Sequence, residues 1–277
     1  MTRSPKALLV RPVRTVLKGA AATADTLRPP VQGITILIYH RVGAGNGGQM
    51  DLAPDAFDRQ LAWLAATQRV LSLDAAADEL ADVAGPPGPG VVLTFDDGTT
   101  DWTEHVLPAL ERHRVPATFY VATDFVDRGV PFPGDGRPIS WAGLADLASS
   151  DLVTIGNHTH RHQLLDRLDP SAIDEELDRA NDLLAEHLGD TPTHFAYPKA
   201  VAGSAAAEEA VRTRFRTAVL AGTRSNDRDV DLHRLWRSPV QPSDGDHWFR
   251  RKAMGGLHLE DDLRRTVNRL RYRGLTS

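Results

Sequence analysis

The sequence predicts an α/β fold: a single domain in which parallel strands alternate with helices. Two observations lead to this prediction. Short apolar runs with the composition of buried strands alternate with segments in which apolar residues recur at helical spacing. In addition, no internal repeat and no long linker divides the 277 residues. There are enough strand–helix units to close a barrel, although an irregular one.

The expected elements follow in order along the chain. The strands are predicted at residues 34–40, 90–97, 115–122, 152–158, 193–198 and 217–222. The helices are predicted at residues 56–64, 73–80, 103–113, 139–149, 171–188 and 205–215, with a C-terminal helix from about 259. In the first helix Phe57, Leu61 and Leu64 share one face, and Pro108 is placed to kink the third.

Composition excludes several classes of protein. The chain is 41% hydrophobic and 25% charged, as is usual for a globular protein, and its net charge of -5 argues against a nucleic-acid binder. Because there is no cysteine, disulfides, thiol nucleophiles and Cys-ligated metals are excluded, so any metal site must be built from histidines and carboxylates.

Residues 1–30 form a basic leader, which we expect to be helical or flexible, before a domain over residues 31–277. Basic residues and Pro12 interrupt its apolar stretch, so we expect neither a secretory signal nor a membrane span of about 20 apolar residues, and we expect a cytoplasmic protein. One helical face of the leader carries Leu9, Val13, Val16 and Leu17. Packing of this face on the domain is the interpretation we favour; peripheral membrane association is the alternative.

Reactive residues follow the ends of four predicted strands. These residues are His40, Asp96, Asp97, His158, His162 and Tyr197. In a parallel α/β barrel the carboxyl ends of all strands open on one face, where active sites are built. We therefore expect these six residues to meet at one mouth.

His158 and His162 are four residues apart directly after a strand. Such a pair faces one side of a helical turn, and with one carboxylate it makes a site that suits Zn²⁺, or alternatively Co²⁺, Ni²⁺ or Fe²⁺. His160, between them, is expected to point toward solvent. The alternative is a pair of solvated surface histidines.

The adjacent Asp96 and Asp97 must repel each other unless their charges are compensated. A dication bound by Asp97 would leave Asp96 free to act as a general base. The alternative is an ordinary Asp-Asp-Gly turn at the end of the strand.

Three separated motifs, TFDDG, HTHRH and FAYP, resemble those of the polysaccharide deacetylase family, which is carbohydrate esterase family four with the NodB-homology domain. The resemblance runs from about Ile34 to Val240 and includes ILIYHRV, which is similar to the branch containing poly-N-acetylglucosamine deacetylases. It implies a distorted (β/α) barrel of the NodB type. It also implies metal-dependent hydrolysis of an acetyl group, usually the N-acetyl of a GlcNAc residue.

The resemblance also implies a role for each site residue. Asp96 corresponds to the catalytic base, and the metal triad is Asp97, His158 and His162. The backbone N–H of Tyr197 would help to hold the oxyanion, whereas the alternative is a rim tyrosine with its hydroxyl in water. His40 would protonate the leaving amine, with a hydrogen-bonded histidine below the barrel rim as the alternative.

The chain departs from the family pattern at two places. No arginine precedes FAYP to orient the base; Arg234 and Arg237 are the candidate substitutes, and a surface or sheet-edge role is the alternative for both. The family's C-terminal LxxH motif has only a weak match in LHRLWR, which makes His233 the reserve candidate for the general acid. Trp102 is expected to line the cleft and stack on a sugar ring.

The function predicted is a metal-dependent de-N-acetylase. Its substrate would be an N-acetylated glycan, a lipid-linked sugar or another glycoconjugate. The alternatives are an amidohydrolase of the same fold acting on a non-sugar amide and a non-catalytic glycan-binding relative.

Overall fold

The structure, a computed structural model, describes residues 33–45, 48–82, 85–134 and 136–257. The expected leader over residues 1–30 and the expected C-terminal helix from about 259 lie outside these residues. No helix in the described ranges is long and apolar enough to cross a bilayer.

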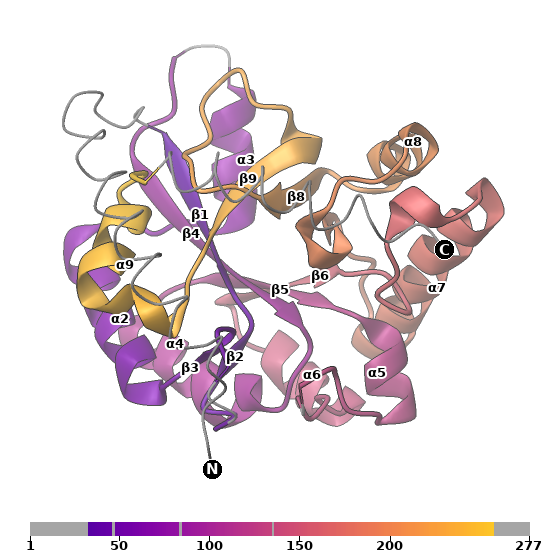
Figure 1. The fold of residues 1–277 in the computed structure, drawn as a ribbon, viewed down its shortest axis with the longest axis horizontal. Helices are drawn as coiled ribbons and strands as arrows, with labels where there is room; N and C mark the ends of the chain where they lie inside the picture. Colours follow the sequence, from indigo (N-terminus) through magenta and orange to yellow (C-terminus); the bar gives the residue numbers. More distant parts are fainter. Residues whose placement is uncertain (1–32, 46–47, 83–84, 135, 258–277) are drawn as a thin grey trace, which may run out of the picture.

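A closed barrel of parallel strands forms the centre of the molecule, so the predicted (β/α) barrel is confirmed. Its strands are β1 (Ile34–Tyr39), β4 (Gly90–Asp97), β5 (Ala117–Val121), β6 (Val153–Asn157), β7 (His194–Ala196), β8 (Thr217–Ala221) and β9 (Leu235–Pro239). The indigo strand β1 lies beside the yellow strand β9, which closes the ring (Figure 1). A second, two-stranded sheet pairs β2 (Arg41–Val42) with β3 (Asp51–Leu52).

The register of the strands brings the predicted site residues to one level. Asp97 pairs with Val121, which pairs with Asn157, the residue before His158. Tyr39, the residue before His40, pairs with Phe95. All these positions are at the carboxyl ends of their strands, so the mouth of the barrel lies where the sequence placed it.

Helices surround the strands (Figure 1). They are α2 (Pro54–Thr67), α3 (Leu73–Ala81), α4 (Leu107–His113), α5 (Thr123–Arg128), α6 (Trp141–Ala148), α7 (Pro170–Leu188), α8 (Ala205–Arg214) and α9 (Gly245–Ala253). Helix α3 packs Leu73, Ala76 and Leu80 against Ile36 and other residues of the barrel interior. Asp74, in the first turn of α3, contacts His194, the first residue of β7, so α3 covers the end opposite the mouth.

Aromatic side chains fill the space between the strands and the surrounding helices. Phe95 stacks on Tyr39 and on Phe119, and Trp102 meets Phe119 edge-on. Trp102 is completely buried, and its indole N–H donates a hydrogen bond to the backbone carbonyl of His40 at 3.0 Å. The prediction that Trp102 lines the cleft is therefore wrong, because the side chain turns into the core after the strand ends.

Several elements differ from the sequence prediction: β2, β3, α5 and α9 were not predicted, and two further differences have a physical reason. The helix expected over 103–113 begins as a π-helical turn, Trp102–Val106, and continues as α4, with Pro108 directly after the change from one helix type to the other. Strand β9 was not predicted as a strand, because Arg237 and Pro239 interrupt its apolar pattern.

Gly156 on β6 gives a test of the interior packing. A Cβ at this position would lie 2.5 Å from the ring of Tyr120 and 3.1 Å from the backbone oxygen of His194. We expect Gly156→Ala to lower the free energy of unfolding by about 1–3 kcal/mol, because overpacking forces the buried ring to move. Urea denaturation measures this, with Gly85→Ala, which meets no atom within 4 Å, as the control. Equal stability of the two variants would contradict the packing described.

Candidate active site

Four of the predicted site residues come together at the mouth of the barrel. Asp96 and Asp97 are the last two residues of β4, whereas His158 and His162 lie in the turn that follows β6. Three of them are buried: His158 is 1% exposed, Asp96 3% and Asp97 7%. The structure therefore brings together residues that are more than 60 positions apart in the sequence.

The backbone of Asp97 explains how two adjacent acids face the same place. Alternation along a strand would send successive side chains to opposite sides. Asp97, however, has a φ of 90°, which an L-residue rarely adopts, and Gly98 follows with a φ of 114°. Its carbonyl accepts a hydrogen bond from the N–H of Ala122 at 2.9 Å, which holds the turn in place. The carboxylate of Asp97 is thus turned toward the histidines beside Asp96.

His158 is held in one tautomer. Its Nδ1 lies 2.7 Å from the carbonyl oxygen of Ala196 at the end of β7. A carbonyl can only accept, so Nδ1 carries the proton and the lone pair is on Nε2. This nitrogen lies 3.9 Å from Oδ1 of Asp97 and 3.2 Å from Nε2 of His162.

Asp97, His158 and His162 fit a metal ion. Their candidate ligand atoms all lie within 4.8 Å of one another, and Nε2 of His162 is 3.8 Å from Oδ1 of Asp97. Two nitrogens bound to one Zn²⁺ at about 2.1 Å, with a tetrahedral angle between them, lie about 3.4 Å apart. The Nε2 atoms of His158 and His162 are 3.2 Å apart, which is close to this value. Burial, together with the neighbouring His158, lowers the pKa of His162 to about 4, so its imidazole is neutral near pH 7.

Asp96 is clamped by Arg237, which lies on β9 and is completely buried. The guanidinium donates to both carboxylate oxygens, Nη1 to Oδ1 at 2.6 Å and Nη2 to Oδ2 at 2.8 Å, and Nη1 also donates to the hydroxyl of Thr94 at 3.1 Å. Burial alone would raise the pKa of Asp96, but the charge of Arg237, with His158 and His40, outweighs it and lowers the pKa to about 2. Arg237 is therefore the residue that orients this carboxylate in place of an arginine before FAYP.

His40 follows β1 directly and is half-buried. It is close enough to Asp96 to contribute to the lowering of that residue's pKa, which places it at the same mouth. Its role as the general acid stays a prediction.

The side chain of Tyr197 lies outside the site. It is 1% exposed and packs edge-on against Phe195, so the alternative of a rim tyrosine in water is wrong. Its backbone N–H donates to the carbonyl of Val219 at 3.3 Å, a long hydrogen bond. An oxyanion-binding role therefore requires this N–H to give up or share its present partner.

Three further expectations change with the structure. His233 precedes β9 and bonds the backbone oxygen of Phe215 at 2.8 Å, so it lies at the opposite end of the barrel and is rejected as the general acid. Arg234 pairs with Glu208 on the surface. His160 does not point into solvent: it is 8% exposed, and its Nδ1 lies 2.9 Å from the hydroxyl of Thr123.

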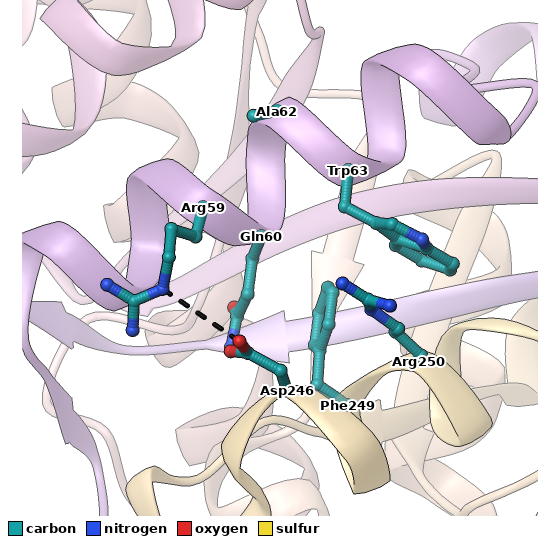
Figure 2. A pocket seen from close by; sticks show the side chains of 7 residues that line it. All are labelled: Arg59, Gln60, Ala62, Trp63, Asp246, Phe249 and Arg250. Carbon is teal, nitrogen blue, oxygen red and sulfur yellow. Dashed lines mark ion pairs between the residues drawn. The ribbon is translucent and has the colours of Figure 1, made fainter.

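A cavity of about 200 Å³ lies away from these residues, between α2 and α9 (Figure 2). Trp63 and Phe249 meet edge-on within it, the guanidinium of Arg250 lies 5.4 Å from the centre of the Trp63 ring, and Arg59 lies 3.9 Å from Asp246. None of the candidate site residues lines it. We interpret it as a gap in the packing between α2 and α9, because aromatic and ion-pair contacts across it join the two helices.

The pair between Arg237 and Asp96 predicts a pattern of stabilities. Arg237→Met should lower the free energy of unfolding by about 3–5 kcal/mol, because it leaves a buried carboxylate uncompensated. In the Asp96→Asn background the same substitution should cost much less, since no charge is stranded. Denaturant unfolding of the four proteins in this cycle measures the coupling. Additive effects would show that the two side chains do not stabilise each other.

Comparisons with known proteins agree with this geometry. Residues 84–218 match the family model described as polysaccharide deacetylase. A chitooligosaccharide deacetylase of Rhizobium leguminosarum bv. trifolii is 31% identical over 104 residues, which cover 37% of this chain and 43% of that protein. The chain spans less than half of the length of several curated relatives that it matches.

Two solved structures share the fold over most of the chain. The structure of IcaB from Ammonifex degensii superposes with a TM-score of 0.70 at 26% identity, covering 81% of this chain and 97% of that one. The Streptococcus pyogenes deacetylase PplD, in complex with acetate, has a TM-score of 0.68 at 22% identity, covering 81% and 99%. The resemblance seen in the sequence is thus confirmed: residues 84–218 match the polysaccharide deacetylase family, and the fold is the (β/α) barrel of the NodB-homology type.

Proposed function

We propose that this protein is a metal-dependent hydrolase that removes the N-acetyl group from a GlcNAc-containing glycan or glycoconjugate and releases acetate. One observation carries the proposal: a cluster of one carboxylate and two imidazoles lies beside a second carboxylate that an arginine clamps. The polysaccharide deacetylase match and the relative named as a chitooligosaccharide deacetylase support the choice of an N-acetylated sugar.

The metal would be held by Asp97, His158 and His162, with Zn²⁺ as the ion we favour. When bound, such an ion acidifies a coordinated water and polarises the acyl oxygen. The chain prepares for this in two ways: the carbonyl of Ala196 binds Nδ1 of His158 and leaves its Nε2 facing the site, and burial keeps the imidazole of His162 unprotonated near pH 7.

Asp96 is the proposed general base. Its carboxylate oxygen Oδ2 lies 3.9 Å from Nε2 of His158, which places it next to the proposed metal ligands. Arg237 keeps Asp96 ionised and orients it, at the expense of base strength, because a carboxylate with a pKa of about 2 accepts a proton weakly. A bound dication would lower the pKa of its water and so reduce the mismatch with this weak base.

His40 is the proposed general acid. Hydrolysis breaks the bond between the acyl carbon and the nitrogen, so the leaving amine must gain a proton while acetate keeps the oxygen from water. The half-buried imidazole of His40 is the candidate donor of that proton, supported by its electrostatic effect on Asp96. The backbone N–H of Tyr197 stays the proposed oxyanion donor, provided that it turns from Val219 when substrate binds.

The base assignment is tested with Asp96→Asn. This variant should release acetate from GlcNAc oligomers about 10²–10⁴-fold more slowly than wild type while keeping the same metal content. Chelation of the wild type should abolish activity, and Zn²⁺ or Co²⁺ should restore it. Unchanged acetate release by Asp96→Asn would remove Asp96 as the base. A protein that binds metal but releases no acetate from any sugar would point to a non-sugar amide or to a non-catalytic binder.

The acid assignment is tested with His40→Ala. We expect turnover to fall by about 10²-fold or more with metal content unchanged, because the leaving group loses its proton donor. Acetate release and metal analysis of the same preparation measure both quantities. Loss of the metal instead would make His40 a ligand. Trp102→Phe, which alters a buried contact to the His40 backbone, serves as the control for indirect effects.

A further inference from the structure

We propose that Glu176, on α7, is a positioning residue that sets the separation of the two imidazoles by holding the turn between them, residues 158–162. The inference rests on the proposed function of His158 and His162 as metal ligands. The turn itself does not depend on a metal, so its restraint is testable separately.

The backbone of the turn adopts conformations that are intrinsically unfavourable for its residues. Thr159 has a φ of 65° and His162 a φ of 55°, and both are in the left-handed region. For a β-branched residue such as Thr159 this conformation is a genuine outlier, and residues of this kind persist only when their surroundings impose it. The restraint must therefore come from contacts outside the turn.

Glu176 supplies contacts at the centre of the turn. Its Oε2 accepts a hydrogen bond from the backbone N–H of Arg161 at 2.7 Å, and its Oε1 accepts one from Nη1 of the same residue at 3.2 Å. Its backbone carbonyl accepts a third from the N–H of His160 at 3.0 Å. Two successive backbone donors between the imidazoles are thus tied to one residue of a helix.

The same helix also restrains the start of the turn. The side-chain oxygen of Asn157 accepts from the N–H of Thr159 at 2.7 Å. Its amide nitrogen donates to the carbonyl of Leu177 at 3.0 Å and to the side-chain oxygen of Asn181 at 2.8 Å. Helix α7 is therefore the common support for the turn.

The chemistry of Glu176 indicates that its role is to bind the turn and not to pack α7 against the barrel. The inward face of α7 is otherwise filled mainly by apolar side chains, among them Ile173, Leu177 and Leu184. Glu176 is 1% exposed, and burying a carboxylate on such a face is costly unless its oxygens are satisfied. Both oxygens of its carboxylate are satisfied by Arg161. An apolar residue at position 176 would pack equally well on the inward face of α7. Only a hydrogen-bond acceptor, however, can bind the backbone N–H of Arg161 in the turn.

The test compares Glu176→Gln with Glu175→Gln. The control residue, Glu175, pairs with the same arginine at 2.8 Å, but through the exposed side chain and without touching the backbone of the turn. Glu176→Gln keeps one acceptor oxygen but replaces the other with an amide N–H donor. The side chain can therefore no longer accept both hydrogen bonds from Arg161. We expect the Zn²⁺ dissociation constant to rise about 10–100-fold in Glu176→Gln, as for other residues that orient metal ligands, and to stay at the wild-type value in Glu175→Gln.

Hydrogen exchange of the metal-free proteins gives the second readout. Amides of residues 159–162 should exchange faster in Glu176→Gln, whereas those of β1 and β4 should keep wild-type rates. Equal acceleration in the barrel strands, or wild-type exchange and wild-type metal affinity, would overturn the inference. If the wild type binds no metal, the proposed function fails, while the exchange rates still decide whether Glu176 holds the turn.

Discussion

The structure of the site depends on the compensation of two adjacent carboxylates buried at the end of one strand. Asp96 and Asp97 repel each other, and burial makes the repulsion stronger. The fold gives each acid different neighbours: a guanidinium that compensates the charge of Asp96, and two imidazoles with which Asp97 would hold a dication. The positive φ of Asp97 is what separates the two roles, because it turns the second carboxylate away from the arginine and toward the histidines.

Closure of the barrel brings Arg237, the partner of Asp96, into place. Arg237 reaches Asp96 because β9 pairs with β1, which pairs with β4. The guanidinium also lies 5.3 Å from the centre of the Tyr120 ring, and that ring occupies the space that a side chain at Gly156 would need. A glycine on β6 therefore makes room for a ring on β5, which supports the arginine that orients the carboxylate on β4. The interior of the barrel acts as one connected support for the proposed base.

The two imidazoles beside Asp97 are held in place by elements other than their own strand. The carbonyl of Ala196 sets the tautomer of His158, and α7 holds the turn that carries His162. The N–H of Asp124 on α5 donates to the carbonyl of His160 at 2.9 Å from the other side. The ligands thus come from one strand end and one turn, but their geometry depends on three further elements. Such surrounding hydrogen bonds orient ligands in metal sites generally.

The sequence by itself determined the barrel class and the three candidate ligands, because apolar strand runs and the reactive residues that follow their ends are local properties of the chain. The helical turn expected for His158 and His162 is wrong, since Thr159 and His162 have positive φ values and contacts with α7 hold the turn instead. The sequence also limited the base-orienting arginine to two positions but could not choose between them, because β9 was not predicted: Arg234 ends the turn before this strand, whereas Arg237 lies in its middle. Only the tertiary structure placed Arg237 beside Asp96, His233 at the far end, Trp102 in the core and His160 against α5. These outcomes depend on strand order and on which face each residue takes in the closed barrel, and both are decided by contacts between residues far apart in the chain.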